Sequence, residues 1–379
     1  MRLLIVNSRF LPMIGGGETY ILELMLYFSS LGWDVHLLTN NNGYKDKKWK
    51  NCTIHSINGF DDTNLAFHTA APQFREVLDD VKPDIIHVHN IMPFFLYSSI
   101  TSQGEFPTVV TIHNTPKLPE RLFGGFGNLR TESIFCKQLF NTGRYDALIF
   151  GSQYYLDSYA QEVPEIQNDK THVVHFFPPS QTVGPFVPKQ PAGSKIRILF
   201  PSRVIQRKGV EECIRALALL PSNFVLDIPA FSYHETSGYN HSIYSLIENL
   251  DLKDRVLLPT SLTTPDMMAE HYKKANIVVI PSHYEGFGIV AVEAMTWGVP
   301  IVTTGVGGLG EIFNDQSCIL VQPHDPDSLA AGIERLSNDD TLYINIAENG
   351  IDTVRSRFGY DKHMQRIKTI YQGAYAATS

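Results

Sequence analysis

The sequence contains few cysteines and no long hydrophobic run. Four cysteines are spread over 379 residues, and no two of them stand at the spacing of a metal site or suggest a disulfide framework. We therefore expect reduced thiols, as in a cytosolic protein. No segment approaches the length of a membrane span, and Arg2–Val6 enters a strand without a signal-peptide pattern. These features predict a cytoplasmic protein with no integral membrane segment.

The chain also lacks an excess of basic residues. Its 31 Lys and Arg stand against 39 Asp and Glu, which gives a formal net charge of −8. A protein that binds nucleic acid through the phosphate backbone needs a basic surface, so we expect no nucleic-acid partner. The basic cluster Tyr44–Lys50 is short, and we interpret it as a solvated loop.

The length of the chain predicts two domains, because 379 residues exceed what one hydrophobic core usually supports. Strand-like apolar runs alternate with helical patterns, which is typical of α/β domains with parallel sheets. A segment rich in proline and glycine at 179–194 predicts a linker between domains at 1–178 and 195–355. Two doubly wound, Rossmann-like domains facing across a cleft would bind ligands at the carboxyl ends of their strands.

The expected strands are short and apolar. They lie near Leu3–Asn7, Asp34–Thr39, Thr53–Ile57, Ile85–His89, Thr108–His113, Ala147–Phe150, His172–Phe177, Ile196–Pro201, Phe224–Ile228, Val256–Leu258, Ile277–Ile280, Ile301–Thr303 and Ile319–Val321.

The most informative segment is Ser282–Glu293, which follows one of these strands and leads into an apolar helical run at 289–295. A helix start exposes unpaired N–H groups and the positive end of the helix dipole, so Gly286 and Gly288 would let a diphosphate approach the backbone. Glu285 and Glu293 are acceptors that suit the hydroxyls of a hexose and a ribose. The segment predicts a nucleotide-sugar site. The alternative is a plain turn with two solvated carboxylates.

Two other segments have the composition of phosphate sites. Gly15–Gly17 precedes a helix whose apolar face runs to Phe28, and its glycines either bind an anion or shape a tight turn. The segment is not the Gly-x-Gly-x-x-Gly fingerprint, which argues against a nicotinamide cofactor. Arg203 and Lys208 follow a strand end and could clamp a diphosphate without a metal, or be ordinary surface charges. We interpret Arg207 as solvated.

With these motifs in order, the chain resembles the family 4 glycosyltransferases, retaining enzymes with the two-domain GT-B fold. The likeness covers nearly the whole chain. The segments that carry it are Gly15–Glu18 for the family's Gly-Gly-x-Glu loop, Thr111–Asn114 for the strand end with its active-site His, Ser202–Gly209 for its Arg and Lys pair, Glu285–Glu293 for its Glu-x7-Glu motif and Gly305–Glu311 for its Gly-Gly-x-x-Glu segment.

The resemblance implies roles for the matching catalytic residues. Arg203 and Lys208 would bind the diphosphate and stabilise the leaving group. Glu285 would hold the donor sugar hydroxyls, and His113 would contact the sugar from the other domain. For His113 the alternative is a histidine at a strand end whose ring is satisfied by a backbone carbonyl.

The resemblance also implies binding residues and a domain arrangement. Glu293 would hold the ribose, and the nucleotide-sugar-binding backbone would come from Gly15, Gly16, Gly286, Phe287, Gly288 and Ile289. The domain at 1–178 would be the acceptor side, the domain at 195–355 would bind the nucleotide-sugar, and a helix at 356–379 would cross back to the first domain.

Two sets of residues bear on the nucleotide base and on the acceptor. Leu226–His234 and Leu257–Ser261 lack the glycines that the family has near the base, so uridine is only the default. Phe123 and Phe126 lie in a segment with three glycines after the His113 strand, where they could stack on an acceptor or belong to an ordinary loop.

Two patterns resemble metal sites. His87 and His89 point to one face of a strand, and a structural role is favoured over metal ligation. The Asp325-Pro326-Asp327 turn is interpreted as a helix N-cap and not as a metal site. We therefore expect no metal and no cofactor.

The sequence thus predicts a retaining enzyme that moves a hexosyl unit from a nucleoside-diphosphate sugar, UDP by default, to the hydroxyl of a carbohydrate or small-molecule acceptor. Two alternatives stay open. One is a non-hydrolysing nucleotide-sugar epimerase, and the other is a noncatalytic subunit that binds a nucleotide-sugar.

Overall fold

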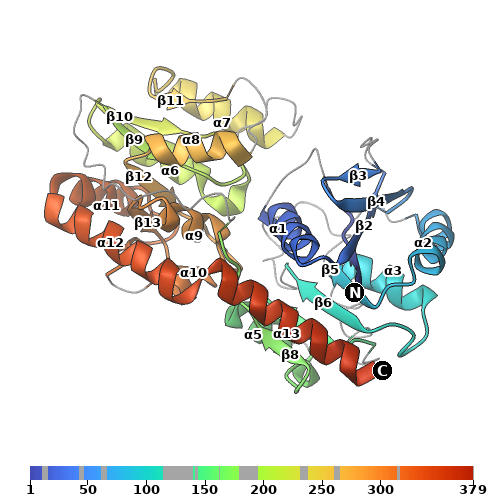
Figure 1. Cartoon of the computed structure of the whole chain (residues 1–379). Helices are drawn as coiled ribbons and strands as arrows, with labels where there is room; N and C mark the ends of the chain where they lie inside the picture. Colours follow the sequence, from blue (N-terminus) through green and yellow to red (C-terminus); the bar gives the residue numbers. More distant parts are fainter. Residues whose placement is uncertain are drawn as a thin grey trace. The chain divides into compact units, whose positions relative to one another are not determined.

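The computed structural model divides into two compact units (Figure 1). Unit 1 comprises residues 1–176 and 360–379, and unit 2 comprises residues 177–359. The structure describes residues 1–10, 16–41, 47–60, 66–113, 140, 144–161, 163–178, 195–230, 238–259, 265–313 and 316–378. The linker expected at 179–194 lies outside these ranges.

Unit 1 contains a sheet with the strand order β3-β4-β2-β1-β5-β6-β7-β8. The strands are β1 (Arg2–Val6), β2 (Asp34–Asn40), β3 (Lys48–Trp49), β4 (Cys52–Ile57), β5 (Ile85–His89), β6 (Thr108–Ile112), β7 (Ala147–Phe150) and β8 (Thr171–Val173). Its helices are α1 (Gly16–Ser30), α2 (Phe67–Val81), α3 (Ile91–Ile100), α5 (Gln153–Ala160), the 3-10 turn η1 (Pro164–Ile166) and α13 (Tyr360–Thr378). The central strands β5, β6 and β7 are buried along their whole length, as expected for parallel strands covered on both faces.

Two expectations for unit 1 were wrong in detail. Lys48–Trp49, at the end of the basic cluster, forms strand β3 antiparallel to β4, where we expected a solvated loop. The Trp49 ring lies edge-on to Phe10 at 6.3 Å, and this contact draws the segment onto the sheet. The strand expected at His172–Phe177 ends at Val173, because the chain then turns so that Phe176 can stack on the His113 ring.

Unit 2 contains a second sheet, with the strand order β11-β10-β9-β12-β13-β14 and parallel pairing. Its strands are β9 (Ile196–Leu199), β10 (Phe224–Asp227), β11 (Val256–Leu257), β12 (Ile277–Ile280), β13 (Ile301–Thr303) and β14 (Ile319–Leu320). Its helices are the 3-10 turn η3 (Gln206–Lys208), α6 (Val210–Leu219), α7 (Gly238–Asn249), α8 (Pro265–Lys274), α9 (Ile289–Thr296), α10 (Leu309–Ile312), α11 (Pro326–Asn338) and α12 (Asp340–Arg357).

The core of unit 2 joins buried residues of the sheet to those of α6, α7, α11 and α12. Asp325 caps α11, since its side chain accepts a hydrogen bond of 2.9 Å from the Ser328 N–H. The N-cap interpretation of the Asp325-Pro326-Asp327 turn is therefore confirmed. Cys213 and Cys318 are buried free thiols in this unit, and Cys52 is one in unit 1.

The last helix begins later than we expected. Residues 356 and 357 still belong to α12, because Arg357 donates hydrogen bonds to the carbonyls of Glu311 (2.6 Å) and Ile312 (3.2 Å) in unit 2. After Gly359 the chain enters α13, which lies along β5 and β6 of unit 1 (Figure 1).

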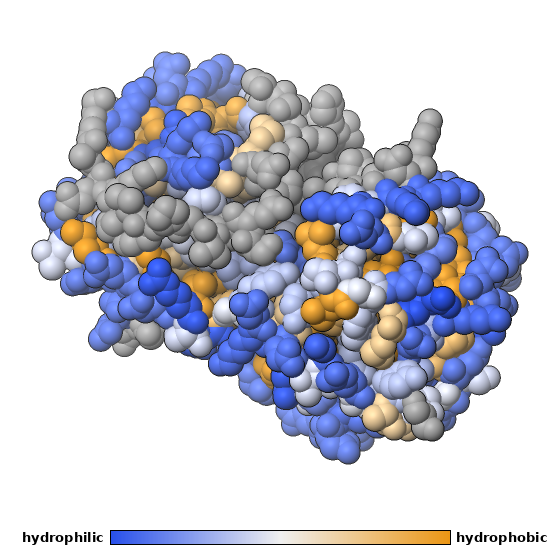
Figure 2. Space-filling view, in the orientation of Figure 1, coloured by the Kyte–Doolittle hydropathy of each residue, from blue (hydrophilic) through white to orange (hydrophobic). Residues whose placement is uncertain are grey.

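Hydrophilic side chains cover much of the face shown in Figure 2, with apolar side chains scattered between them. In the described part of the chain, no helix combines the length and the apolar character that crossing a membrane requires.

Histidines hold α13 against the unit 1 sheet. His87 on β5 is hydrogen bonded through Nδ1 to the Tyr371 hydroxyl (2.6 Å) and through Nε2 to the Thr111 hydroxyl (2.7 Å). On α13, His363 Nδ1 donates to the His175 carbonyl at 2.7 Å, and its Nε2 lies 3.1 Å from the Tyr20 hydroxyl. These bonds give His87 the structural role that was favoured over metal ligation.

The buried histidines predict that unit 1 loses stability in mild acid. Burial lowers the pKa of His87 to about 3 and those of His113 and His363 to about 4. The unfolded chain titrates near pH 6.5, so it binds more protons than the folded chain below that pH. The stabilisation is complete above pH 6.5 and falls as the pH drops toward 4, by up to about 1.4 kcal/mol per pH unit for each histidine.

Urea denaturation at pH 7.0 and pH 5.0 tests this prediction, with tryptophan fluorescence in a Trp297→Phe background that leaves Trp33 and Trp49 of unit 1 as reporters. The urea midpoint should fall between pH 7.0 and 5.0. His113→Gln should reduce that fall, while His68→Gln, which changes an exposed histidine on α2, should not. Equal midpoints at both pH values would contradict the prediction.

Candidate functional site

The candidate site of unit 2 lies where the strand order reverses. β9 and β12 are neighbours in the sheet but are separated in sequence, and the chain progresses outward from them in both directions. In such sheets ligands bind outside the carboxyl ends of the strands at this reversal. Residues 200–209 follow β9 and residues 281–288 follow β12, so both predicted motifs meet at that edge.

Lys208 and Glu285 form a buried ion pair at this edge. Lys208 ends the turn η3 after β9, and its Nζ donates a hydrogen bond to a Glu285 carboxylate oxygen. Burial lowers the pKa of Lys208, although Glu285 opposes that shift. Burial also raises the pKa of Glu285, but Lys208, Arg207 and the Gly286 N–H together hold it below its ordinary value. Glu285 is therefore buried and paired with Lys208, and the interpretation of Glu285 as a solvated charge is wrong.

The two arginines of this segment differ. Arg203 is exposed after β9. Arg207 is half-buried and donates to the Tyr284 carbonyl at 3.4 Å, while the Arg207 carbonyl accepts from the His283 N–H at 2.9 Å. The expectation that Arg207 is solvated was wrong, because these bonds tie the turn after β9 to the turn after β12.

Glycine makes the turn before α9 possible. Gly288 caps the helix with φ +95°, in the left-handed region where side chains are strained. Gly308 lies against the same turn, and its N–H donates to the Glu285 carbonyl at 2.9 Å. A Cβ on Gly308 would stand 1.9 Å from the Gly286 carbonyl oxygen. The segment 305–311 can therefore pack on the 285–288 turn only with glycine at this position.

The helix α9 begins at Ile289, so its first amides follow the glycine turn as predicted. The side chain of Phe287 is buried and lies edge-on to Phe358 at 5.8 Å. Phe287 thus anchors the turn to the end of α12, and its backbone, not its side chain, is available to a ligand, as we predicted.

Glu293 lies about one turn along α9 and has a different partner. The Tyr272 hydroxyl on α8 donates to its carboxylate at 2.9 Å, and the side chain is half-buried. Burial raises the pKa of Glu293 to about 7, against the lowering effect of the Tyr272 bond. Glu293 is therefore no ordinary surface carboxylate. The sequence analysis missed Tyr272, since no spacing connects α8 to α9.

His113 directly follows β6 in unit 1, and β6 neighbours β5, one of the two strands between which the order reverses. Its Nε2 is 2.8 Å from His89 Nδ1, and its ring stacks on Phe176 at 5.1 Å. Among the described residues, the hydrogen-bond partner of the ring is His89, and none is a backbone carbonyl. Its low pKa keeps it neutral at physiological pH, where it can donate or accept a hydrogen bond but adds no charge.

The backbone around His113 is also fixed. Its N–H donates to the Asn90 side chain at 3.1 Å, and its carbonyl accepts from the Tyr155 hydroxyl at 2.7 Å. Gly16 is the exposed first residue of α1, as the glycine-loop prediction requires. The other predicted residues of this unit, Gly15, Phe123 and Phe126, lie outside the described residues.

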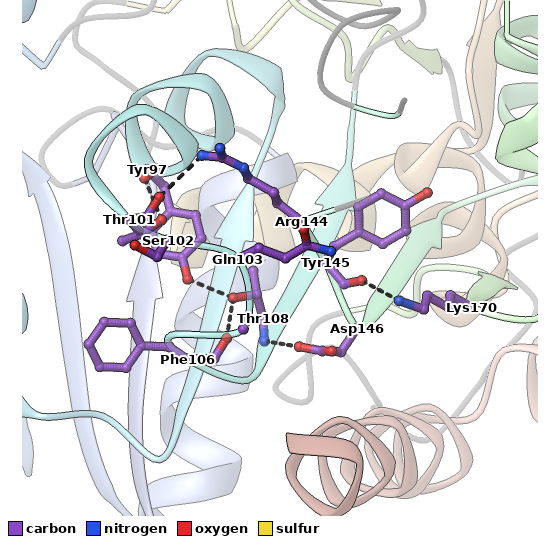
Figure 3. A pocket seen from close by; sticks show the side chains of 11 residues that line it. Tyr97, Thr101, Ser102, Gln103, Phe106, Thr108, Arg144, Tyr145, Asp146 and Lys170 are labelled. Atoms are coloured by element: carbon purple, nitrogen blue, oxygen red, sulfur yellow. Dashed lines mark hydrogen bonds between the residues drawn. The ribbon is translucent and has the colours of Figure 1, made fainter. Parts of the chain in front are cut away.

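A separate hollow lies at the opposite edge of the unit 1 sheet (Figure 3). Thr108 at the start of β6 donates its N–H to Asp146 at 2.8 Å and bonds the Tyr97 hydroxyl at 2.7 Å. Lys170 donates to the Tyr145 carbonyl at 3.1 Å. The polar groups of this hollow hold strand ends together, so we assign no ligand to it.

Two family models match the chain. Residues 14–176 match the model described as Glycosyltransferase Family 4, and residues 186–353 match the model described as Glycosyl transferases group 1. An uncharacterized glycosyltransferase of Methanocaldococcus jannaschii is 24% identical over 381 residues, which cover 97% of this chain and 97% of that protein.

Solved structures show the same architecture. Sucrose-phosphate synthase from Thermosynechococcus elongatus superposes with a TM-score of 0.86 at 21% identity, covering 99% of each chain. HepE of Anabaena, solved with UDP and glucose, gives a TM-score of 0.79 at 18% identity, covering 97% of this chain and 98% of HepE. Because the two family models together match most of the sequence, the chain belongs to the family 4-like glycosyltransferases with the GT-B fold, as its motif order predicted.

Proposed function

We propose that this glycosyltransferase is a retaining enzyme that moves a hexosyl unit from a nucleoside-diphosphate sugar to an acceptor hydroxyl without a metal ion. The observation that carries the proposal is the buried Lys208–Glu285 pair beside the start of α9. It brings a fixed cation, a sugar-binding carboxylate and the positive end of a helix to one place.

The pair is suited to a ligand that carries both phosphate and hydroxyl groups. A diphosphate can take the place of the carboxylate as the partner of Lys208, and Glu285 then becomes free to accept hydrogen bonds from sugar hydroxyls. In the absence of donor, each side chain neutralises the other, so neither buried charge is left uncompensated. Donor binding would thus exchange one set of charged hydrogen bonds for another.

The chemistry would consist mainly of leaving-group stabilisation. Charge develops on the nucleoside diphosphate as the glycosidic bond breaks, and Lys208, Arg203 and the amides at the start of α9 would neutralise it. Because fixed cations supply this charge, a divalent cation is not required for the transfer step. His113, as a neutral imidazole, would contact the donor sugar.

UDP is the proposed nucleotide. HepE, which shares the fold, has been solved with UDP-glucose, and this supports a UDP-sugar donor. Gly15 and Gly16 near the diphosphate, and Phe123 and Phe126 near a carbohydrate or small-molecule acceptor, remain predictions from the resemblance. A cytoplasmic location also remains a prediction.

Assays of donor turnover with and without acceptors test this function against the two alternatives. A transferase turns over the donor efficiently only with an acceptor and keeps the anomeric configuration of the donor in the product. Conversion of the donor to its epimer without acceptor would favour the epimerase. Donor binding without any turnover across a broad acceptor panel would favour the noncatalytic subunit.

Replacing either cation should slow transfer strongly. We expect Lys208→Ala and Arg203→Ala each to lower kcat by about a hundredfold or more, as the loss of one preorganised electrostatic group usually does. Lys253→Ala is the matched control, since Lys253 is an exposed lysine of the same unit that pairs with Glu248. Near-normal turnover in both single variants would remove the leaving-group assignment.

Replacing the two glutamates should change different kinetic constants. Glu285→Gln should mainly lower kcat, because Glu285 is assigned to the reacting sugar. Glu293→Gln should mainly raise the KM for the donor, because uniform ribose binding is lost. Since Glu293 has a pKa of about 7, the donor KM of the wild type should also rise as the pH falls from 8 to 6, and Glu293→Gln should remove that dependence. Interchanged phenotypes would overturn these roles.

Transfer should not need magnesium or manganese. With Lys208, Arg203 and the helix start already neutralising the diphosphate, we expect kcat in excess chelator to stay within about twofold of its value with added magnesium. The assay compares initial rates of the same enzyme preparation under both conditions. Complete loss in chelator, reversed by either ion, would show that the phosphate site uses a metal.

A further inference from the structure

Three potential metal ligands converge on unit 2 beside the donor site. Glu212 in the first turn of α6, His283 after β12 and His324 after β14 each offer one ligand atom, and these atoms all lie within 4.8 Å of one another. Among the described residues, no other group of three or more His, Cys, Asp or Glu side chains meets this condition. The roles derived above use none of the three.

The cluster already has most of the geometry of a coordination site. His283 Nε2 lies 2.9 Å from Glu212 Oε1, and His324 Nδ1 lies 3.9 Å from the same oxygen. Ligand atoms at about 2.0–2.1 Å from a tetrahedral zinc ion stand about 3.3 Å apart. These two separations lie on either side of this value, and the ligand atoms of His283 and His324 lie within 4.8 Å of each other. Side-chain rotations that also separate the two stacked rings would bring all three atoms to one ion.

The surroundings hold two ligands firmly and leave the third accessible. The side chains of His283 and Glu212 are 7% and 16% exposed, whereas that of His324 is 63% exposed. His324 has φ +60°, a conformation that non-glycine residues rarely adopt, and its ring lies over that of His283 with centroids 3.7 Å apart. An ion could therefore enter from the His324 side and keep a solvent ligand there.

We propose that Glu212, His283 and His324 form a binding site for a divalent transition-metal ion of the zinc type. Two imidazoles and one carboxylate are a ligand set that suits Zn²⁺, while Mg²⁺ prefers oxygen ligands in octahedral geometry. The ion would replace the proton that His283 Nε2 now shares with Glu212, because a ligating imidazole nitrogen must be deprotonated.

Such a site would fasten the segments that carry the donor site. Glu212 lies four residues after Lys208, and His283 lies two residues before Glu285. His324 adds a third segment, the turn between β14 and α11. A bound ion would thus cross-link the two segments that carry Lys208 and Glu285 and would stabilise unit 2. It would not contact the transferred sugar.

Direct zinc titration of the full chain tests the site independently of turnover. Protein stripped with chelator and then freed of it is titrated with Zn²⁺ in competition with a chromogenic indicator, and with Co²⁺ followed by its visible spectrum. We expect one zinc ion per chain, a tetrahedral-type cobalt spectrum, and a melting temperature that rises with Zn²⁺ but not with Mg²⁺.

His324→Ala is the decisive variant, because this exposed side chain can be removed without disturbing the core. We expect His324→Ala and Glu212→Gln to weaken zinc binding by about tenfold or more and to abolish the rise in melting temperature. His241→Ala, which removes an exposed histidine from α7, should bind zinc as the wild type does. If Glu212→Gln fails to fold, His324→Ala and the cobalt spectrum of the wild type still show whether the cluster binds a metal ion.

Two results would overturn the proposal. One is the absence of stoichiometric zinc binding by the wild type, in which case the cluster is only a hydrogen-bonded histidine–carboxylate pair. The other is unchanged zinc affinity in His324→Ala. Since these measurements need no donor or acceptor, their failure leaves the proposed transferase activity untouched, and failure of the transfer assay leaves the metal site untouched.

Discussion

The buried pair of Lys208 and Glu285 is the interaction on which the site of unit 2 depends. A buried charge without a partner costs several kcal/mol, so the two segments that follow β9 and β12 must meet closely enough to bring these side chains together. The Arg207 and His283 backbones supply one link between the segments. The close approach of Gly308 to Gly286 supports the turn from the other side. The glycines therefore help to position the Lys208–Glu285 pair.

The two units share a doubly wound topology, but the residues at the carboxyl ends of their strands differ in chemistry. In unit 2 the strand order reverses between β9 and β12, and the candidate residues follow these two strands. In unit 1 it reverses between β1 and β5, and His113 follows β6, the neighbour of β5. In unit 2 the residues there are charged and paired. In unit 1 the residue there is His113, whose pKa is lowered, and the structural His87 on β5 joins the same sheet to Tyr371 of α13. The unit 2 edge thus presents a lysine–glutamate pair, while the unit 1 edge offers a neutral imidazole.

Most of the fold could be predicted from local patterns. Apolar runs such as Ile277–Ile280 and glycines such as Gly288 act within a few residues, so strand, turn and helix followed from sequence alone. Strand β3 could not, because Lys48 and Trp49 read as part of a polar loop and join the sheet through a contact with Phe10, far away in sequence. The start of α13 was also missed, since Arg357 is held by carbonyls of residues 311 and 312.

The fold class, the order of the motifs and the charged residues could be inferred from composition, short-range spacing and the resemblance to the glycosyltransferase family. The partners of these residues could be found only in the folded chain. Glu285 pairs with Lys208 and Glu293 with Tyr272, and His283 meets Glu212 and His324, across separations that no local pattern encodes. The physical reason is that hydrogen bonding and desolvation depend on distance in space, and the order of strands in the sheet sets that distance.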